Sequence, residues 1–363
     1  VGGLAMSIEA DGSDLSVFGH NFRNNYEVCL DSLGNVFQND NDDQVVACRT
    51  TWLMQYANAG YSSADGKRSW QADRRPDQST PIAHWHQADP GVIPYGDLYG
   101  AGSPTGMVVY EGDAFGEDMR GILLSCEAGR NVVFGYHALP QGAGFDLTRF
   151  SLFSSGLPDD PNYKWNKVEQ DQRTWFRPSD VAVGTDGAIY VADWFDPIVG
   201  GHAMQDLEGS GTIYRIAPKG QTLTAPKIDV TTLDGQIAAL KSPAPNVRFL
   251  GFEKLRARGE EVLAEVSALR NDDNPYVRAR MVWLMAQLGD AGRRAVVKLL
   301  DHDDPSARIV AFRALLRTNM DLLAHATRLA ADPSPAVRRE VALAMRDVPL
   351  EACQDILVKL AEG

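Results

Sequence analysis

Arginine and asparagine stand side by side at the start of an apolar run, a pairing that suits an oxygen-bearing planar group. In HNFRNNYEVCLDSLGNVFQNDNDD, residues 20–43, the pair is Arg23-Asn24, and the run that follows it has the composition of a β-strand. Arginine offers a fixed fork of donors for a carboxylate or a quinone oxygen, and asparagine offers both a donor and an acceptor. A salt bridge with a turn-stabilising asparagine explains the same pair without a ligand.

The same stretch ends in five oxygen-bearing side chains, Asn39-Asp40-Asn41-Asp42-Asp43. Hard cations such as calcium prefer oxygen ligands, so Asp40, Asp42 and Asp43 are candidate calcium ligands. The spacing of an EF-hand loop and its distal glutamate are missing. A solvated turn rich in Asp and Asn accounts for the cluster equally well.

Two histidines flank a tryptophan in His84-Trp85-His86. In an extended segment side chains repeat every second residue, so both imidazoles would lie on one face. With acidic residues nearby in the sequence, either histidine is a candidate general base or metal ligand. Packing and hydrogen bonding within a long loop is the alternative.

The pattern of residues 20–43 returns in shorter form at FRPSDVAVGTDGAIYVAD, residues 176–193, where Arg177 precedes two strand-like runs and Asp193 ends the second. Another Arg-Asn pair, Arg130-Asn131, also opens an apolar run. This repetition predicts a β-unit whose strand ends carry polar groups toward the mouth of a propeller. The residues predicted to line that mouth are Arg23, Asn24, Arg130, Asn131, Arg177 and Asp193.

Short β-type runs bounded by Gly, Asp and Asn position these side chains within residues 1–219. Their lengths and turns fit the blades of an all-β fold rather than βαβ units. The predicted strands are 15–18, 27–30, 35–38, 105–109, 121–125, 131–136, 180–184, 188–192 and 212–216. Residues 50–104 are predicted to be a long inserted loop, of a length that is usually functional or a lid. Fewer than six blades are available, which predicts an exposed sheet edge or a missing N-terminal half.

A different pattern begins after a linker predicted at residues 220–244. The motif Pro-x-x-Arg recurs every 30 residues, and each proline opens a run with apolar residues at helical spacing. Residues 245–363 are therefore predicted to form a solenoid of helical repeats, and the motif resembles HEAT repeats. The four arginines, Arg248, Arg278, Arg308 and Arg338, are predicted to form an internal ladder that pairs with acids of adjacent repeats. A row of arginines that binds a partner is the alternative.

Composition narrows the function further. The net charge of −13 argues against nucleic acid as a partner, and no run of 18 apolar residues could span a membrane. The four cysteines form no CxxC pair; Cys29 and Cys48 could bridge neighbouring strands or remain buried thiols. Phosphate-loop, dinucleotide and GxSxG motifs are missing. The chain opens in what reads as a strand and turn, which suggests a fragment without its signal peptide.

The motifs together resemble the bacterial membrane-bound dehydrogenase family. They include HNFRNNYEVCLDSLGNVFQNDNDD, NAGY, QADRRPDQ, AHWHQADPGV, GAGSPTGMVVYEGDAFG, AGRNVVFGYH, QGAGFD and FRPSDVAVGTDGAIYVADWFDPIVGGH. Members pair a glucose/sorbosone-dehydrogenase-like β-propeller with HEAT repeats and usually a C-terminal CxxCH cytochrome c module. In the related quinoproteins, a Gly-x-Arg-Asn-Pro segment holds the quinone. Arg23 and Asn24 match it, whereas Asn21 and Asn25 stand in place of Gly and Pro.

The resemblance implies a multidomain β + α chain, a partial β-propeller with long insertions followed by a HEAT-like solenoid. It implies part of an extracytoplasmic, periplasmic or membrane-associated dehydrogenase that oxidises a sugar or polyol. Pyrroloquinoline quinone and calcium are the implied cofactors, a cytochrome c module the implied electron acceptor, and haem c is expected outside this chain. The other hypothesis is a non-catalytic propeller that binds carbohydrate or protein, with the solenoid as a scaffold for a protein partner.

Overall fold

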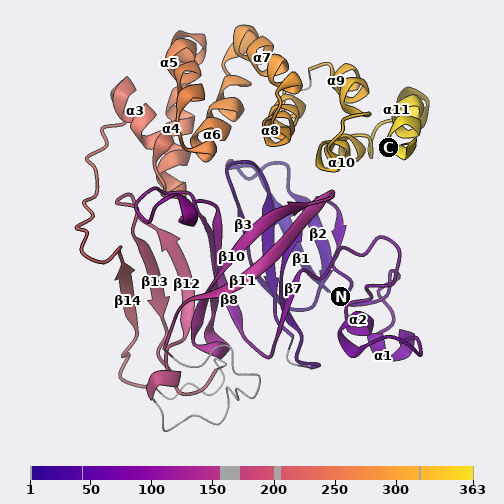
Figure 1. The fold of residues 1–363 in the computed structure, drawn as a ribbon, viewed down its shortest axis with the longest axis vertical. Helices are drawn as coiled ribbons and strands as arrows, with labels where there is room; N and C mark the ends of the chain where they lie inside the picture. Colours follow the sequence, from indigo (N-terminus) through magenta and orange to yellow (C-terminus); the bar gives the residue numbers. More distant parts are fainter. Residues whose placement is uncertain (1, 43, 156–171, 200–205, 319, 363) are drawn as a thin grey trace.

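The computed structural model describes residues 2–42, 44–155, 172–199, 206–318 and 320–362 of the 363-residue chain. Four β-sheets occupy the first part of the chain, and a curved row of helices lies across one end of them (Figure 1). The chain is a partial β-propeller with long insertions followed by an α-helical solenoid, as the sequence predicts.

Three of the sheets are blades, in which antiparallel strands lie side by side in chain order. The first blade contains β3 (Asn25–Leu30), β4 (Val36–Asp40), β5 (Cys48–Leu53) and β7 (Asp97–Gly100). The second contains β8 (Pro104–Tyr110), β9 (Ile122–Glu127), β10 (Val132–Gln141) and β11 (Gly144–Ser154). The third contains β12 (Pro178–Val183), β13 (Ile189–Asp193) and β14 (Thr212–Ile216). A fourth sheet joins β1 (Gly3–Ser7), β2 (Ser16–Phe22) and the short β6 (Ala57–Asn58).

The inner strands β3, β8 and β12 pack against one another in that order, so the blades stack face to face. Alternate residues of the second blade point to opposite neighbours, because side chains alternate across a strand. Met107 and Val109 pack against the first blade, whereas Val108 and Tyr110 pack against the third. This two-sided burial explains why all six residues of β9 are buried, the polar Ser125 and Glu127 included.

All nine predicted strands are present, but the prediction of one long loop over residues 50–104 is wrong in part. That segment contains most of β5, then β6, the helices α1 (Trp70–Asp73) and α2 (Thr80–His84), and β7. Strand β5 buries the polar residues Arg49, Thr50 and Thr51, and so lacks the apolar alternation by which strands are recognised.

The suggested Cys29–Cys48 disulfide is not formed, and both residues are buried free thiols. Cys29 lies on β3 and Cys48 on β5, with β4 between them. Because neighbouring strands are roughly 4.8 Å apart, two strands of separation exceed the reach of a disulfide.

The helices that follow are α3 (Leu233–Lys241), α4 (Pro245–Arg256), α5 (Leu263–Ala268), α6 (Pro275–Met285), α7 (Gly289–Lys298), α8 (Pro305–Leu316), α9 (Leu322–Leu329), α10 (Pro335–Ala344) and α11 (Leu350–Glu362). The four repeated prolines are the first residues of α4, α6, α8 and α10, as predicted. Proline suits this position because the first backbone N–H of a helix has no intrahelical partner. Asn274 and Asp304 cap the next turn by accepting from the N–H groups of Tyr276 and Ser306. No helix in the described part of the chain is long and apolar enough to cross a membrane.

The predicted arginine ladder is correct in part. Each of the four repeated arginines donates to a carbonyl of the turn before its helix: Arg248 to Pro243, Arg278 to Asp272, Arg308 to His302 and Arg338 to Asp332. Arg308 also binds both carboxylate oxygens of Asp332, in the next repeat, at 2.8 Å. Arg248 instead pairs at 2.7 Å with Glu111 of the second blade. The ladder mainly closes turns within repeats.

The solenoid sits on the end of the blades where the inner strands finish, called here the solenoid end (Figure 1). Trp283 donates to the carbonyl of Ser32 at 2.9 Å, and Arg313 donates to that of Leu33 at 2.9 Å. Buried Glu111 accepts from Arg280 at 2.6 Å and from Arg248 at 2.7 Å. These contacts come from α4, α6 and α8.

Candidate functional site

The opposite end of the blades, where the inner strands begin, is called here the distal end. A carboxylate closes the second strand of each blade at this end, opposite the start of the inner strand. The three register pairs are Asp40 with Asn25, Glu127 with Pro104, and Asp193 with Pro178. Each carboxylate accepts the backbone N–H of the residue before its inner strand: Asn24 at 2.7 Å, Ser103, and Arg177 at 2.8 Å.

Glu127 is the member of this set that sequence reasoning missed. Its blade carries Glu where the others carry Asp, and its Arg-Asn pair follows the second strand rather than preceding the first. Burial raises the pKa of Glu127 to about 7, against the hydrogen bonds from Ser103, Tyr99 and Gly129 that favour its ionised form. Burial also raises the pKa of Asp40 and of Asp193.

Four of the residues predicted to bind the cofactor form hydrogen bonds with backbone groups instead. Arg177 is 1% exposed and donates to the carbonyls of Asp196, Ala128 and Pro197 at 2.8–3.0 Å. Asn131 is buried and donates to the carbonyls of Thr174 and Phe176, which lead into the third blade. Arg130 donates to the carbonyl of Ala101 at 2.7 Å, and Asp193 holds the N–H groups of Arg177 and Phe195.

The remaining candidates gather around one carboxylate. Asp42 Oδ1 lies 3.1 Å from Arg23 Nε and 3.2 Å from His84 Nε2. Burial alone raises the pKa of Asp42, but the close approach of the His84 ring, the Val45 N–H and the charge of Arg23 outweigh it and lower the pKa. Arg23 also donates to the carbonyl of Asn41, and Asn24 beside it is exposed. The structure therefore brings together Arg23, Asp42 and His84, which the sequence analysis treated as separate candidates for cofactor binding, calcium binding and general-base catalysis.

His84 is fully buried and ends helix α2. Nε2 lies 3.2 Å from Asp42 Oδ1 without the geometry of a hydrogen bond, so neither ring nitrogen has a hydrogen-bond partner among the described residues. Tyr61, Trp70 and Trp85 surround the ring edge-on, the Trp85 centroid 4.7 Å from that of His84.

The prediction that both histidines share one face of an extended segment is wrong, because the segment is the end of a helix. His86 has a left-handed backbone, with φ of 46°, and its Nδ1 lies 2.7 Å from the carbonyl of Gly60. Its Nε2 lies 3.6 Å from Asp73. Between the histidines, Trp85 is completely buried under the guanidinium of Arg49, 3.7 Å from its ring centroid.

The described residues do not form a quinone pocket on their own. Of the six residues predicted to line one, four bind backbone groups inside or between blades, and Arg23 is held by Asp42 and Asn41. The calcium ligands fit no better. Asp40 accepts from Arg49 at 3.2 Å, Asp42 binds His84 and Arg23, and Asp43 lies outside the described residues. No group of three or more His, Cys, Asp or Glu within the described ranges could hold a metal.

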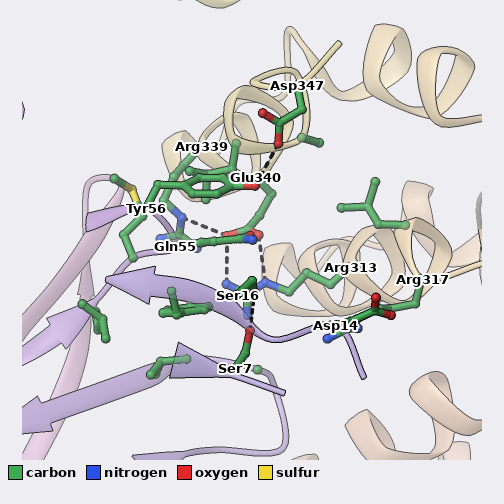
Figure 2. Close-up of a pocket in the computed structure, with 18 of the residues that line it drawn as sticks. Ser7, Asp14, Ser16, Gln55, Tyr56, Arg313, Arg317, Arg339, Glu340 and Asp347 are labelled. Carbon is green, nitrogen blue, oxygen red and sulfur yellow. Dashed lines mark hydrogen bonds and ion pairs between the residues drawn. The ribbon is translucent and has the colours of Figure 1, made fainter. Parts of the chain in front are cut away.

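A large cavity lies at the other end, between the fourth sheet and the solenoid. It measures about 820 Å³ and is lined by the β1–β2 hairpin, the end of β5 and helices α6, α8 and α10 (Figure 2). A smaller one of about 230 Å³ lies nearby, beneath the tip of the β10–β11 hairpin. Sequence reasoning missed both, since their walls come from segments that are distant in the chain.

Comparison with known protein families assigns the chain to a family. The family model described as a domain of unknown function (DUF7133) matches residues 1–220, more than half of the 363-residue chain. The chain belongs to this family. In this DUF7133 protein a second model, HEAT repeats, matches residues 262–345. No curated protein matches the chain.

Several solved structures are distantly similar to the DUF7133 chain. A glucose dehydrogenase-type oxidoreductase from Thermus thermophilus has 14% identity and a TM-score of 0.36, covering 57% of this chain and 48% of that one. The PQQ-bound aldose sugar dehydrogenase from Streptomyces coelicolor has 14% identity and a TM-score of 0.37, covering 59% and 51%. The soluble apo aldose sugar dehydrogenase from Escherichia coli has 15% identity and a TM-score of 0.34, covering 52% and 47%. The chain spans about half the length of these structures, and so distant a likeness does not bear on activity.

Proposed function

We propose that this chain is part of an extracytoplasmic, quinoprotein-like dehydrogenase that oxidises a sugar or a polyol and passes electrons to a cytochrome module. Residues 1–219 form its blade unit, residues 220–244 a linker and residues 245–363 the helical solenoid. The sequence resemblance to membrane-bound dehydrogenases supports the reaction class. We place the reaction at the distal end of the blades, where the candidate residues lie.

The arrangement of Arg23, Asp42 and His84 carries the proposal. Oxidation of a CH–OH group needs a base for the hydroxyl proton while a hydride equivalent leaves the carbon for the acceptor. Asp42 lies 3.2 Å from Nε2 of His84, on the side of the ring opposite to Nδ1, so a proton on Nε2 leaves the Nδ1 lone pair to take the hydroxyl proton. Asp42 then stabilises the imidazolium, in the way that a carboxylate orients a catalytic histidine. Arg23 fixes the Asp42 carboxylate from the other side.

Substrate access requires a movement of the segment that covers His84. The ring is fully buried, and part-exposed Trp70 of α1 is one of the aromatic residues against it. Helix α1 is four residues long and contributes no buried residue. Displacement of α1 is therefore the least costly way to open the histidine to solvent.

A dye-linked oxidation assay with the purified 363-residue chain tests this function. Purified protein is mixed with pyrroloquinoline quinone, calcium and an artificial electron acceptor, and a panel of aldoses and polyols is supplied. We expect turnover that falls about 100-fold or more in the His84→Gln and Asp42→Asn variants, because a positioned base contributes ~100- to 10,000-fold. The control His137→Gln alters an exposed histidine of β10 and leaves turnover unchanged.

Turnover that falls equally in the control contradicts the role of His84. A complete lack of turnover with every substrate, from protein whose thermal unfolding is intact, contradicts the dehydrogenase function itself.

The second candidate is a non-catalytic propeller that binds carbohydrate or protein on a HEAT scaffold. It is favoured by the observation that Arg177, Asn131 and Asp193 form hydrogen bonds with backbone groups of the blades, where a quinone ligand would need them to face a pocket. Retained glycan or protein binding without turnover supports it over the first.

A further inference from the structure

The cavity at the solenoid end has walls from two units that are some 300 residues apart in the chain. One wall is the β1–β2 hairpin, from Ser7 to Phe18, and the end of β5 with the turn after it, from Trp52 to Tyr56, forms the floor. The other wall is formed by α8 and by α10 with the turn after it (Figure 2). Its volume of about 820 Å³ lies within the range of ligand pockets, roughly 300–1,000 Å³, and domain interfaces are a common place for them.

Fixed ion pairs form the back of this cavity. Buried Glu340 accepts from Arg313 at 2.8 Å through both carboxylate oxygens and also binds its neighbour Arg339. At the rim, Arg317 pairs with Glu9 at 2.8 Å. Arginine and acid charges thus nearly cancel around the cavity, and no excess of positive charge is left to attract an anion.

Further polar groups line the cavity beside these ion pairs, and two of them have no protein partner. Gln55 and Asp14 are exposed cavity residues for which the structure shows no hydrogen bond or ion pair within the described part of the chain. In Figure 2 the Gln55 side chain extends from the sheet side toward Arg313 and Glu340. Ser7 and Ser16 share a hydroxyl–hydroxyl bond of 2.8 Å on the hairpin wall. Together these groups can both donate and accept.

Aromatic rings accompany the polar groups. Phe18, Trp52, Tyr56 and Trp283 all line the cavity and are each partly exposed. Tyr56 has a left-handed backbone, with φ of 65°, which is uncommon for a bulky residue and costs free energy. Its ring lies 3.5 Å below the guanidinium of Arg346, and its hydroxyl binds Asp347 at 3.1 Å. Strain of this kind is concentrated at ligand sites, and here the contacts with Arg346 and Asp347 hold Tyr56 in the strained conformation.

We propose that this cavity is a binding site for a neutral oligosaccharide, separate from the distal end. Sugar hydroxyls donate and accept, which matches Gln55, Asp14 and the Ser7–Ser16 pair. The apolar C–H faces of sugar rings pack on aromatic side chains, which matches the ring lining. The near balance of charge favours a neutral glycan over an anionic one. The inference does not depend on whether the distal end is catalytic.

Binding of soluble oligosaccharides to the intact chain tests the site. Hexasaccharides of cellulose, xylan, mannan and amylose are titrated by calorimetry, with tryptophan emission as a second signal because Trp52 and Trp283 line the cavity. We expect at least one neutral hexasaccharide to bind, and oligogalacturonate, which is anionic, not to bind. A parallel pull-down with the insoluble polysaccharides separates recognition of chain interiors from recognition of free ends.

Two variants locate the binding to the cavity. Gln55→Ala and Asp14→Ala are each expected to weaken binding about tenfold, the effect of one lost hydrogen bond of about 1.4 kcal/mol. The matched controls Gln71→Ala and Asp118→Ala remove exposed side chains elsewhere and leave the affinity unchanged. All four variants are checked for unchanged thermal unfolding, and the His84→Gln variant is expected to bind as tightly as the parent.

The proposal is overturned if no neutral glycan binds at millimolar concentration. It is also overturned if binding is equal in the cavity variants and controls, or if the anionic glycan or a peptide library binds in place of the neutral glycans.

Discussion

The two ends of the blades hold comparable sets of charged residues and use them in opposite ways. At the distal end Arg177, Asp193 and Glu127 bind backbone groups within or between neighbouring blades. At the solenoid end Glu111 binds Arg248 and Arg280, which belong to helices more than 130 residues further along the chain. Distal charges build the blades, and charges at the solenoid end dock the second domain.

This difference bears on how motifs are interpreted. The Arg-Asn pairs and terminal acids of the distal end repeat because each blade has the same backbone groups to satisfy. A repeated polar motif therefore indicates a repeated fold before it indicates a site. Asp42 also accepts backbone N–H groups, those of Gln44, Val45 and Ala47. In addition it lies against Arg23 and against His84, and so brings together side chains of the blade and of the inserted helix α2.

The largest expected effect is at the docking contact. The Glu111→Leu variant leaves Arg248 and Arg280 buried without their carboxylate, so the free energy of unfolding should fall by about 3–5 kcal/mol. Denaturant titration measures it, and a split into two transitions would show that the domains come apart. Glu117→Leu, at an exposed surface ion pair, is the control and should change stability by less than about 1 kcal/mol. An equal effect of the two would refute the docking role.

A somewhat smaller loss is expected in the third blade. The Arg177→Met variant leaves three carbonyls without their donor and should lower the free energy of unfolding by about 3 kcal/mol. Arg75→Met removes an exposed arginine paired with Asp89 and should cost less than about 1 kcal/mol. If Arg177 were instead a cofactor ligand, its replacement would abolish quinone binding and leave thermal unfolding of the chain unchanged.

Glu127 predicts a pH dependence of opposite sign to ordinary acid denaturation. Its folded pKa of about 7 lies above the usual value of 4.5, so its stabilising contribution is complete below about pH 4.5 and is lost as pH rises toward 7. Thermal unfolding of the parent and of the Glu127→Gln variant, measured from pH 4.5 to 8, tests this. The stability of the parent relative to the variant should decrease across that window by about 3 kcal/mol. A constant difference would mean that the carboxyl stays ionised throughout.

The smallest expected effect is a difference in stability between variants of two arginines of the ladder. Arg308→Met removes a two-oxygen ion pair with Asp332 as well as a turn contact, whereas Arg278→Met removes contacts to turn carbonyls. We expect the first variant to be less stable than the second by about 1–2 kcal/mol. Equal midpoints in urea would show that pairing between repeats adds nothing to the turn contacts.

The sequence alone determined the features that rest on local pattern. The 30-residue period placed the first residues of α4, α6, α8 and α10, because proline and apolar spacing act within a few turns of one helix. Nine strands were found from short apolar runs and turns for the same reason. Strand β5 was not predicted, since its buried Arg49 and Thr51 have partners that no local pattern shows.

Tertiary structure alone decided which side chains meet. Asp42 reaches His84 across 42 positions, Glu111 reaches Arg280 across 169, and the walls of the large cavity come from opposite ends of the chain. A hydrogen bond or ion pair depends on distance in space, which local periodicity does not encode. The sequence therefore shows that residues 177 and 23 are arginines, but not what they bind. In the structure Arg177 donates to backbone carbonyls, and Arg23 pairs with a carboxylate that also contacts a histidine.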